Sequence, residues 1–327
     1  MKAWLLDEFS GLAHLRQSEV ADPIPGPGEA LLQMLFAGLN PADRYLAEGQ
    51  YPARPPLPHI LGRDGIGTVQ RIGTGVADIG LGERRTILRG EVGVTRAGTF
   101  AHLVSVPAQN LVEVPAGWSE QEAAGATLVY LTAYQALTMW GPLPASSIVL
   151  VTGASGGVGV ASVQLASAMG FKVIALSRSE EKSQRLRQLG AAATFNPQDS
   201  QWRQAAKEMF APRRLDLLVD NIGGTLLPQV IDLLGELGKV SLVGRLAGPV
   251  PNFNTAALFF RRLRMGGVAA GAYTNAESRA AWGEVVRLLA SIGARPLVDS
   301  VYPFEQLPQA FARLEKGPLG KVLLQTQ

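Results

Sequence analysis

The chain has 327 residues, more than the roughly 250–300 that one hydrophobic core usually serves, so two domains are expected. Hydrophobic residues make up 47% and charged residues 17% without long charged runs, which excludes a disordered chain. A scattered formal net charge of +3 does not favour a nucleic-acid partner, and zero cysteines exclude disulfides and sulfur-ligated zinc.

The first third of the chain predicts a β-rich domain. Short runs at residues 2–6, 29–37, 65–72 and 100–106 are separated by proline and glycine, which is typical of strands joined by turns. Residues 51–58, YPARPPLP, hold too many prolines for regular structure, so we expect an extended surface loop there. Loops of this kind often line binding sites.

From Ser119 onward the pattern changes to alternating helices and strands. Ser119 and Glu122 predict a capping box that opens a helix, and a second helical run covers residues 133–139. Strands are then expected at residues 148–152, 172–177, 193–196, 215–221, 239–243 and 263–271, with helices between them. This α/β alternation predicts a doubly wound parallel sheet, a Rossmann domain, over residues 121–271.

The last stretch is expected to complete the first domain. Two helices are expected at residues 276–292 and 304–314, and two strands at 297–301 and 321–325. The β-rich substrate domain is therefore predicted to be discontinuous, comprising residues 1–120 and 272–327, with the nucleotide-binding domain inserted.

A glycine-rich turn between the strand at residues 148–152 and the next helix predicts a dinucleotide site. Glycines in this position permit a tight turn, close approach of a pyrophosphate and close packing of the helix, whose N-terminus faces the negative charge. A turn that is glycine-rich for steric reasons alone is the alternative. The residues expected to cradle the cofactor are Gly153, Ala154, Ser155, Gly156, Gly157, Val158 and Gly159.

The second strand of this domain indicates which dinucleotide binds. NAD-preferring sites usually carry an acidic residue about 20 positions after the glycine turn, whereas this strand ends in ALSRSEEK. Ser177, Arg178 and Lys182 are expected to hold a 2′-phosphate. Cations near a helix N-terminus interact unfavourably with the helix dipole, so a bound anion explains their presence there. The cofactor expected is NADPH, and ordinary surface charges are the alternative interpretation.

Six motifs in one order resemble the medium-chain dehydrogenase/reductases, and within them the zinc-free quinone oxidoreductases. They are GLNPADRYLAEGQYP (38–52), GRDGIGTV (62–69), LTAYQAL (131–137), GASGGVG (153–159), LVDNIGG (218–224) and GKVLL (320–324). The resemblance covers essentially the whole chain. It implies a GroES-like β-rich catalytic domain joined to a Rossmann domain, and a homodimer formed through the edge of the Rossmann sheet.

The resemblance also bears on the reaction. Zinc-dependent alcohol dehydrogenases of this family have a cysteine where Asn40 stands and a histidine–glutamate pair where Arg63 and Asp64 stand. Their absence here implies metal-free hydride transfer from NADPH to a quinone or an α,β-unsaturated carbonyl compound. By the same resemblance Asn40, Tyr45 and Tyr51 face the nicotinamide, and Tyr51 is the expected proton donor. A loop aromatic packed on the domain is the alternative for each tyrosine.

Further cofactor contacts follow from the resemblance. Thr132 is expected beneath the cofactor, Asn221 and Gly244 at the ends of strands beside it, and Lys321 near the 2′-phosphate. The structural alternatives are a helix-capping hydroxyl for Thr132, simple strand-end turns for Asn221 and Gly244, and a solvent-facing strand residue for Lys321.

Two other functions remain open from the sequence: an enoyl-CoA or enoyl-ACP reductase, and a non-catalytic NADPH-binding protein of the crystallin or sensor kind. The partner expected is a small molecule. A membrane partner is not expected, because no stretch approaches 18 uninterrupted apolar residues and the N-terminus does not read as a signal peptide. The cytoplasm is the expected location.

Overall fold

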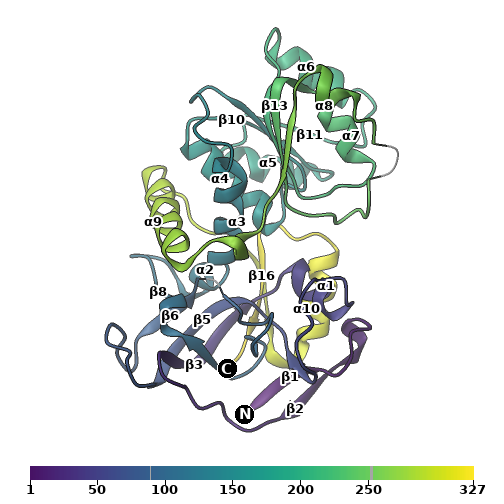
Figure 1. Cartoon of the computed structure of the whole chain (residues 1–327). Helices are drawn as coiled ribbons and strands as arrows, with labels where there is room; N and C mark the ends of the chain where they lie inside the picture. Colours follow the sequence, from purple (N-terminus) through teal and green to yellow (C-terminus); the bar gives the residue numbers. More distant parts are fainter. Residues whose placement is uncertain (89, 251–252) are drawn as a thin grey trace. The chain divides into compact units, whose positions relative to one another are not determined.

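The computed structural model describes residues 1–88, 90–250 and 253–327, and the chain divides into two compact units (Figure 1). Unit 1 comprises Met1–Leu128, Tyr273–Trp282 and Arg295–Gln327, and unit 2 comprises Val129–Ala272 and Gly283–Ala294. Helix α9 (Asn275–Ser291) gives residues to both units. The boundaries expected from the sequence lie close to these breaks but assign α9 wholly to the first domain.

Unit 1 is built on two sheets. The larger has seven strands in the order β15-β16-β3-β5-β6-β8, with β7 also paired to β3, and the smaller has the order β2-β1-β4. The strands are β1 (Lys2–Leu6), β2 (Leu15–Glu19), β3 (Glu29–Gly38), β4 (His59–Ile60), β5 (Asp64–Ile72), β6 (Arg84–Ile87), β7 (Leu103–Pro107), β8 (Leu111–Glu113), β15 (Val298–Pro303) and β16 (Lys321–Gln325). The antiparallel pairing of β16 with β3 sets Leu323 opposite Gly38, so the C-terminal strand completes the sheet that the N-terminal segment begins.

The helices of unit 1 are short. They are α1 (Pro41–Ala47), α2 (Glu120–Ala124) and α10 (Leu307–Glu315), with single 3-10 turns at Leu12–His14, Ala108–Asn110 and Phe304–Gln306. The capping box expected at the start of α2 is confirmed, since the Glu122 N–H donates to Ser119 Oγ at 3.2 Å. Helix α1 was not expected, and it packs Leu46 into a core that includes Phe100 and Phe311.

Unit 2 holds the doubly wound sheet that the alternating pattern predicts. Its six strands run in the order β11-β10-β9-β12-β13-β14, and every neighbouring pair is parallel. They are β9 (Ile148–Val151), β10 (Lys172–Leu176), β11 (Ala193–Phe195), β12 (Leu215–Asp220), β13 (Leu234–Leu242) and β14 (Arg264–Gly267). The strand order reverses at β9, and ligands of such sheets bind beyond the carboxyl ends of the strands at that point.

The helices that accompany this sheet follow the expected alternation. They are α3 (Thr127–Thr138), α4 (Gly157–Ala168), α5 (Glu180–Gln188), α6 (Trp202–Phe210), α7 (Leu226–Ile231) and α8 (Ala256–Phe260), with a 3-10 turn at Ala270–Ala272. Buried Leu150, Ile174 and Leu218 belong to the main core of the unit. Within the described part of the chain, no helix has both the length and the apolar character that crossing a membrane requires.

Candidate functional site

The glycine turn of unit 2 joins β9 to α4. Gly153 has φ +57°, a left-handed conformation that glycine adopts without strain. A Cβ on Gly159 would stand 2.3 Å from the Gly153 carbonyl oxygen, so only glycine lets α4 approach the turn this closely. Gly156 is the N-cap of α4, and a Cβ there would meet only the Gly153 oxygen, at 3.6 Å. Two of the three glycine roles expected from the sequence, the tight turn and the close packing of the helix, therefore have a steric basis.

The N-terminus of α4 is arranged to receive an anion. Ala154 and Ser155 lie in the turn, and Gly157 and Val158 begin the helix, whose first turn contains only glycine and valine. Backbone N–H groups at a helix start carry a partial positive charge that a phosphate can meet. Space at Gly156 and this uncompensated charge together fit a pyrophosphate group.

A buried carboxylate braces the strand ends beside this turn. Thr152 donates to Asp220 Oδ1 at 2.6 Å, and the Gly223 N–H donates to Asp220 Oδ2 at 3.0 Å. Burial raises the pKa of Asp220, while these hydrogen bonds favour its charged form. The sequence reasoning missed Thr152 and Asp220, although each stands at a strand end beside the glycines that it supports.

Asn221 and Gly244 lie close to the turn, as expected. The Asn221 amide donates to the Thr152 carbonyl oxygen at 2.8 Å, which ties the end of β12 to the end of β9. A Cβ on Gly244 would stand 3.0 Å from the Asn221 oxygen, so glycine keeps the end of β13 close. Both residues thus have a structural role, and their contact with a cofactor stays a prediction.

The residues expected at the 2′-phosphate follow β10, the strand next to β9. Ser177 is buried and its Oγ donates to the Ser179 carbonyl oxygen at 3.1 Å. Arg178 is exposed, and Lys182 lies in the first turn of α5, where its N–H donates to Ser179 Oγ at 3.4 Å. Glu180 and Glu181 share this turn and offset the helix dipole, so the cations there do not by themselves require a bound anion.

Thr132 lies in the middle of α3. The alternative that its hydroxyl caps a helix is therefore wrong, because a cap stands at the helix start. Its expected place beneath a cofactor stays a prediction.

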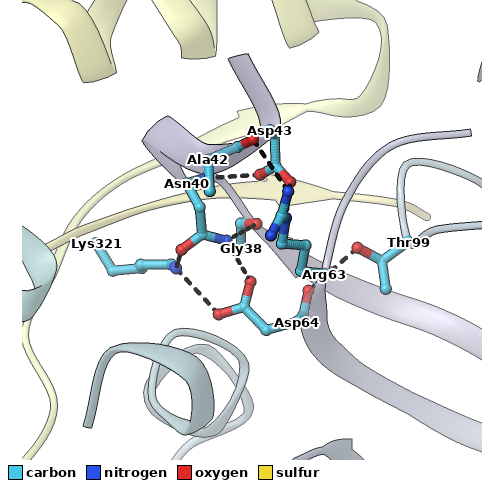
Figure 2. Close-up of polar contacts among 8 residues, drawn as sticks. All are labelled: Gly38, Asn40, Ala42, Asp43, Arg63, Asp64, Thr99 and Lys321. Atoms are coloured by element: carbon cyan, nitrogen blue, oxygen red, sulfur yellow. Dashed lines mark hydrogen bonds and ion pairs between the residues drawn. The ribbon is translucent and has the colours of Figure 1, made fainter. Parts of the chain in front are cut away.

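Unit 1 holds a buried polar cluster around Asn40, the residue just before α1 (Figure 2). The Asn40 amide donates to Asp64 Oδ1 at 2.8 Å and to the Gly38 carbonyl oxygen at 3.3 Å, and it accepts from Lys321 Nζ at 2.6 Å. These partners fix which end of the amide is nitrogen, because a carboxylate accepts and an ammonium donates. Both amide hydrogens are engaged, so in this arrangement Asn40 has no hydrogen left to donate to a substrate oxygen.

Lys321 lies inside this cluster rather than at the surface. Its side chain is 4% exposed, and Nζ stands 3.0 Å from Asp64 Oδ2. A Cβ on Gly38 would stand 2.7 Å from Lys321 Cε, so glycine makes room for the lysine stem. The alternative of a solvent-facing strand residue is wrong. The expected approach to a 2′-phosphate stays a prediction, and the ammonium is bonded here to Asp64 and Asn40.

A second buried ion pair adjoins the first. Asp43 is fully buried, accepts from the Asn40 N–H at 2.9 Å and pairs with Arg63, whose Nε lies 3.1 Å from Asp43 Oδ1. Burial raises the pKa of Asp43 to about 6 even though the Arg63 charge and the Asn40 N–H act in the opposite direction. The two pairs meet at Asn40, which ties α1 to β5 and β16.

The two candidate tyrosines lie in and just after α1. Tyr45 is half-buried, and the Arg44 guanidinium carbon lies 5.4 Å from its ring centroid. Tyr51 is half-buried, packs against the core around Leu46, and has the Arg63 guanidinium carbon 4.3 Å from its ring centroid. Part of the environment of the two tyrosines therefore fits the alternative interpretation, in which each is a loop aromatic packed on the domain. Their catalytic role stays a prediction.

The described residues contain no group of three or more histidine, cysteine or acidic side chains placed to hold a metal ion. Asn40, Arg63 and Asp64 stand where the resemblance sets zinc ligands, and they are joined to Lys321 and Asp43 through the contacts drawn in Figure 2.

Comparisons with known proteins agree with both units. The family model described as "Alcohol dehydrogenase GroES-like domain" matches residues 26–116, and the one described as "Zinc-binding dehydrogenase" matches residues 157–291. The first covers much of the large sheet of unit 1. The second begins at the first residue of α4 and takes in the later strands of the parallel sheet.

Whole-chain relatives were also found. The human synaptic vesicle membrane protein VAT-1 homolog is 31% identical, over 99% of this chain and 86% of the relative. The quinone oxidoreductase of Lama guanicoe is 31% identical, over 99% of this chain and 97% of the relative. The crystal structure of Escherichia coli quinone oxidoreductase complexed with NADPH has a TM-score of 0.89 at 25% identity, covering 99% of this chain and 100% of that one. The chain belongs to the medium-chain dehydrogenase/reductase family of oxidoreductases, among its quinone oxidoreductase-like proteins.

Proposed function

We propose that this protein is an NADPH-dependent oxidoreductase that reduces a quinone or an α,β-unsaturated carbonyl compound without a metal ion. Unit 2 binds the cofactor at the glycine turn, and unit 1 supplies the hydrogen-bond or proton donor for the acceptor oxygen. The single observation that carries the assignment of this donor is the hydrogen bonding of Asn40. Because both of its amide hydrogens are engaged, we assign the donor to another side chain.

The fit of unit 2 to NADPH rests on the turn and on the segment after β10. Gly156 leaves room at the start of α4, and the helix offers its N–H groups to the pyrophosphate. Arg178 is exposed and follows directly after Ser177, where a 2′-phosphate would lie in such a sheet. The NADPH complex of the Escherichia coli quinone oxidoreductase supports the same cofactor.

The chemistry of the proposed reaction needs a donor near the acceptor oxygen. When bound, NADPH supplies a hydride, and one proton completes the two-electron reduction of the acceptor. A tyrosine phenol can donate a hydrogen bond or a proton at neutral pH while it is itself un-ionised. We assign this role to Tyr51 and give Tyr45 a second, orienting contact. Asn40 then holds the segment that carries both tyrosines.

The metal-free character of the reaction is supported by charge. Lys321 and Arg63 bring two positive charges to the cluster that replaces the zinc ligands, and each is paired with one aspartate. A divalent cation would need at least some of these carboxylates for itself. Polarisation of the acceptor must therefore come from hydrogen-bond donors.

The homodimer is part of the same proposal. Strand β14 is an edge of the parallel sheet, and α8 beside it in sequence exposes Phe259 and Phe260, which are 63% and 78% exposed. An apolar edge of this kind is a common dimer contact. Light scattering that gives the monomer mass at micromolar concentration would contradict this part.

Oxidation of NADPH, followed by absorbance in chelator-treated buffer, tests the proposed function. A quinone, an enone and an enoyl thioester are offered in parallel. Turnover with the quinone or the enone is expected. Turnover confined to the enoyl thioester would favour the thioester reductase instead. Tight binding of NADPH without turnover of any acceptor would favour the non-catalytic protein.

A further inference from the structure

We propose that Arg63 is a positioning residue, which holds the ring of Tyr51 in the orientation from which its hydroxyl donates. This inference rests on the role of Tyr51 in the proposed function. It assigns to Arg63 a function that neither the motif comparison nor the family match gives it.

The Arg63 guanidinium contacts two hydrogen-bond acceptors and one aromatic ring. Nε donates to Asp43 Oδ1 at 3.1 Å, and Nη2 donates to the Ala42 carbonyl oxygen at 3.0 Å. Its central carbon lies over the Tyr51 ring, 4.3 Å from the centroid. One side chain thus joins the first turn of α1 to Tyr51, in the loop beyond the end of the helix.

The anchors of Arg63 are themselves fixed. Asp43 is fully buried and accepts from the Asn40 N–H at 2.9 Å, so its carboxylate is held in one orientation. Arg63 directly precedes Asp64, whose carboxylate is held by Lys321 and Asn40. The Arg63 side chain is only 9% exposed. A rigid frame therefore determines where the guanidinium plane lies, and with it the ring that stacks on it.

The geometry calls for arginine and not merely for a positive charge. A planar guanidinium can donate in its plane to two acceptors while its face stacks on an aromatic ring. The lysine ammonium is compact and strongly hydrated, and it cannot form both in-plane bonds and the stack. Arg63→Lys keeps the charge that Asp43 needs and loses the stack, which separates the positioning role from simple charge pairing.

The matched control is another arginine–aspartate pair of unit 1. Arg313 of α10 donates from Nε to Asp299 Oδ2 at 2.8 Å, with a side chain that is 29% exposed. Arg313→Lys makes the same chemical change in a pair that has no contact with the candidate tyrosines among the interactions of the described residues. Any general loss of stability that comes from weakening an arginine–aspartate pair should appear in both variants.

The kinetic experiment is a double-mutant cycle on the intact protein. For an acceptor that the wild type reduces, Arg63→Lys is expected to lower kcat by about 10- to 100-fold, while the acceptor KM and the NADPH Kd change by less than about threefold. In the Tyr51→Phe background, Arg63→Lys is expected to cause almost no further loss of kcat. Arg313→Lys should leave kcat near the wild-type value. An equal loss from Arg63→Lys with and without Tyr51→Phe would overturn the proposal, as would an unchanged kcat in Arg63→Lys when Tyr51→Phe lowers kcat.

A second readout does not depend on turnover. The chain has six tyrosines, so fluorotyrosine labelling gives a resolvable spectrum in which the Tyr51 signal is the one lost in Tyr51→Phe. Arg63→Lys is expected to shift and broaden that signal, whereas Arg313→Lys leaves it in place. An unmoved Tyr51 signal would overturn the positioning role whatever the activity. If the signal moves but Tyr51→Phe does not lower kcat, Arg63 does hold the ring and it is the proposed use of Tyr51 that fails.

Discussion

The Lys321 ammonium and the Asp64 carboxylate form an ion pair 3.0 Å long, with side chains that are 4% and 1% exposed. Lys321 begins the last strand of the chain and Asp64 begins β5, so the pair joins segments 257 residues apart. Asn40 contacts both partners and carries the connection to α1. The segment that holds the candidate tyrosines is therefore anchored on buried charge.

Breaking one half of this pair should destabilise the protein more than removing both halves. Lys321→Met leaves the Asp64 charge buried without its cation, and Asp64→Asn does the reverse. Each single change is expected to cost about 3–5 kcal/mol in the free energy of unfolding. The double variant should cost much less than the sum of the two. Denaturant titration measures all three, and additive losses would contradict the direct coupling of the two charges.

The pH dependence of stability should carry the signature of Asp43. Burial raises its pKa from 3.8 to about 6 in the folded protein, so the folded state holds this proton more tightly than the unfolded chain. The contribution of this proton to the free energy of unfolding is fully present below the unfolded pKa of 3.8, and it is lost as the pH rises through about 6. The whole loss is about 3 kcal/mol at most.

Comparison with Asp43→Asn isolates this effect. The variant retains an oxygen that can accept the Asn40 N–H, and it does not titrate. The free energy of unfolding of the wild type, minus that of the variant, is expected to fall between about pH 4 and pH 7. Urea titrations at several pH values give this difference. A difference that rises with pH would show that the Arg63 ion pair, and not burial, dominates the pKa of Asp43.

Two glycines of the turn should respond differently to alanine. Gly159→Ala places a Cβ 2.3 Å from a carbonyl oxygen and is expected to destabilise unit 2 as well as to weaken NADPH binding. Gly156→Ala has ordinary space within the protein, so its cost in stability should be about 1 kcal/mol or less. Its methyl group would fill the space proposed for the phosphate, and the NADPH Kd should rise about tenfold or more.

Gly283→Ala is the control for these two variants. Gly283 lies within α9, and a Cβ there would meet nothing within 4 Å, so stability should rise slightly with NADPH binding unchanged. Thermal unfolding and fluorescence titration measure the two quantities. Unchanged NADPH affinity in Gly156→Ala would argue that this turn is a steric feature and not a phosphate cradle.

The preference for NADPH over NADH should depend on Arg178. Its side chain is exposed at the end of β10, and loss of one charge-assisted hydrogen bond to a phosphate corresponds to about 10- to 100-fold in affinity. Arg178→Ala is therefore expected to weaken the binding of NADPH by that factor and to leave the affinity for NADH unchanged. Cofactor fluorescence measures both. Equal effects on the two cofactors would place the 2′-phosphate elsewhere.

Unit 2 was largely predictable from the sequence because its signals are local. Each apolar run is followed by a glycine or a helix cap within a few residues, and the turn at Gly153 lies between a strand and a helix. The end of β13 was expected, but its start at Leu234 was not, since two glycines and a glutamate follow within residues 235–238 and do not form a strand pattern.

The cluster of unit 1 was not predictable in the same way. The contacts of Lys321 were not predicted, because Asp64 and Asn40 lie 257 and 281 residues away in the sequence. No sequence signal near Lys321 indicates that its side chain is buried. Helix α1 was missed although Asn40, Pro41 and Asp43 form a helix-start signal, because a helix of seven residues is too short to show a clear apolar period. The role of Arg63 depends on Tyr51 and Asp43 together, and only the folded chain brings the three into contact.

The most direct test of the central claim is isotope transfer from the cofactor. The protein is incubated, in chelator-treated buffer, with NADPH deuterated at the hydride position of the nicotinamide and with an enone acceptor. Mass spectrometry of the product then locates the deuterium. We predict one deuterium at the β-carbon of the saturated ketone and a proton from solvent on the neighbouring carbon. Saturated product without deuterium, or no reduction of either enone or quinone while NADPH binds tightly, would contradict metal-free hydride transfer by this protein.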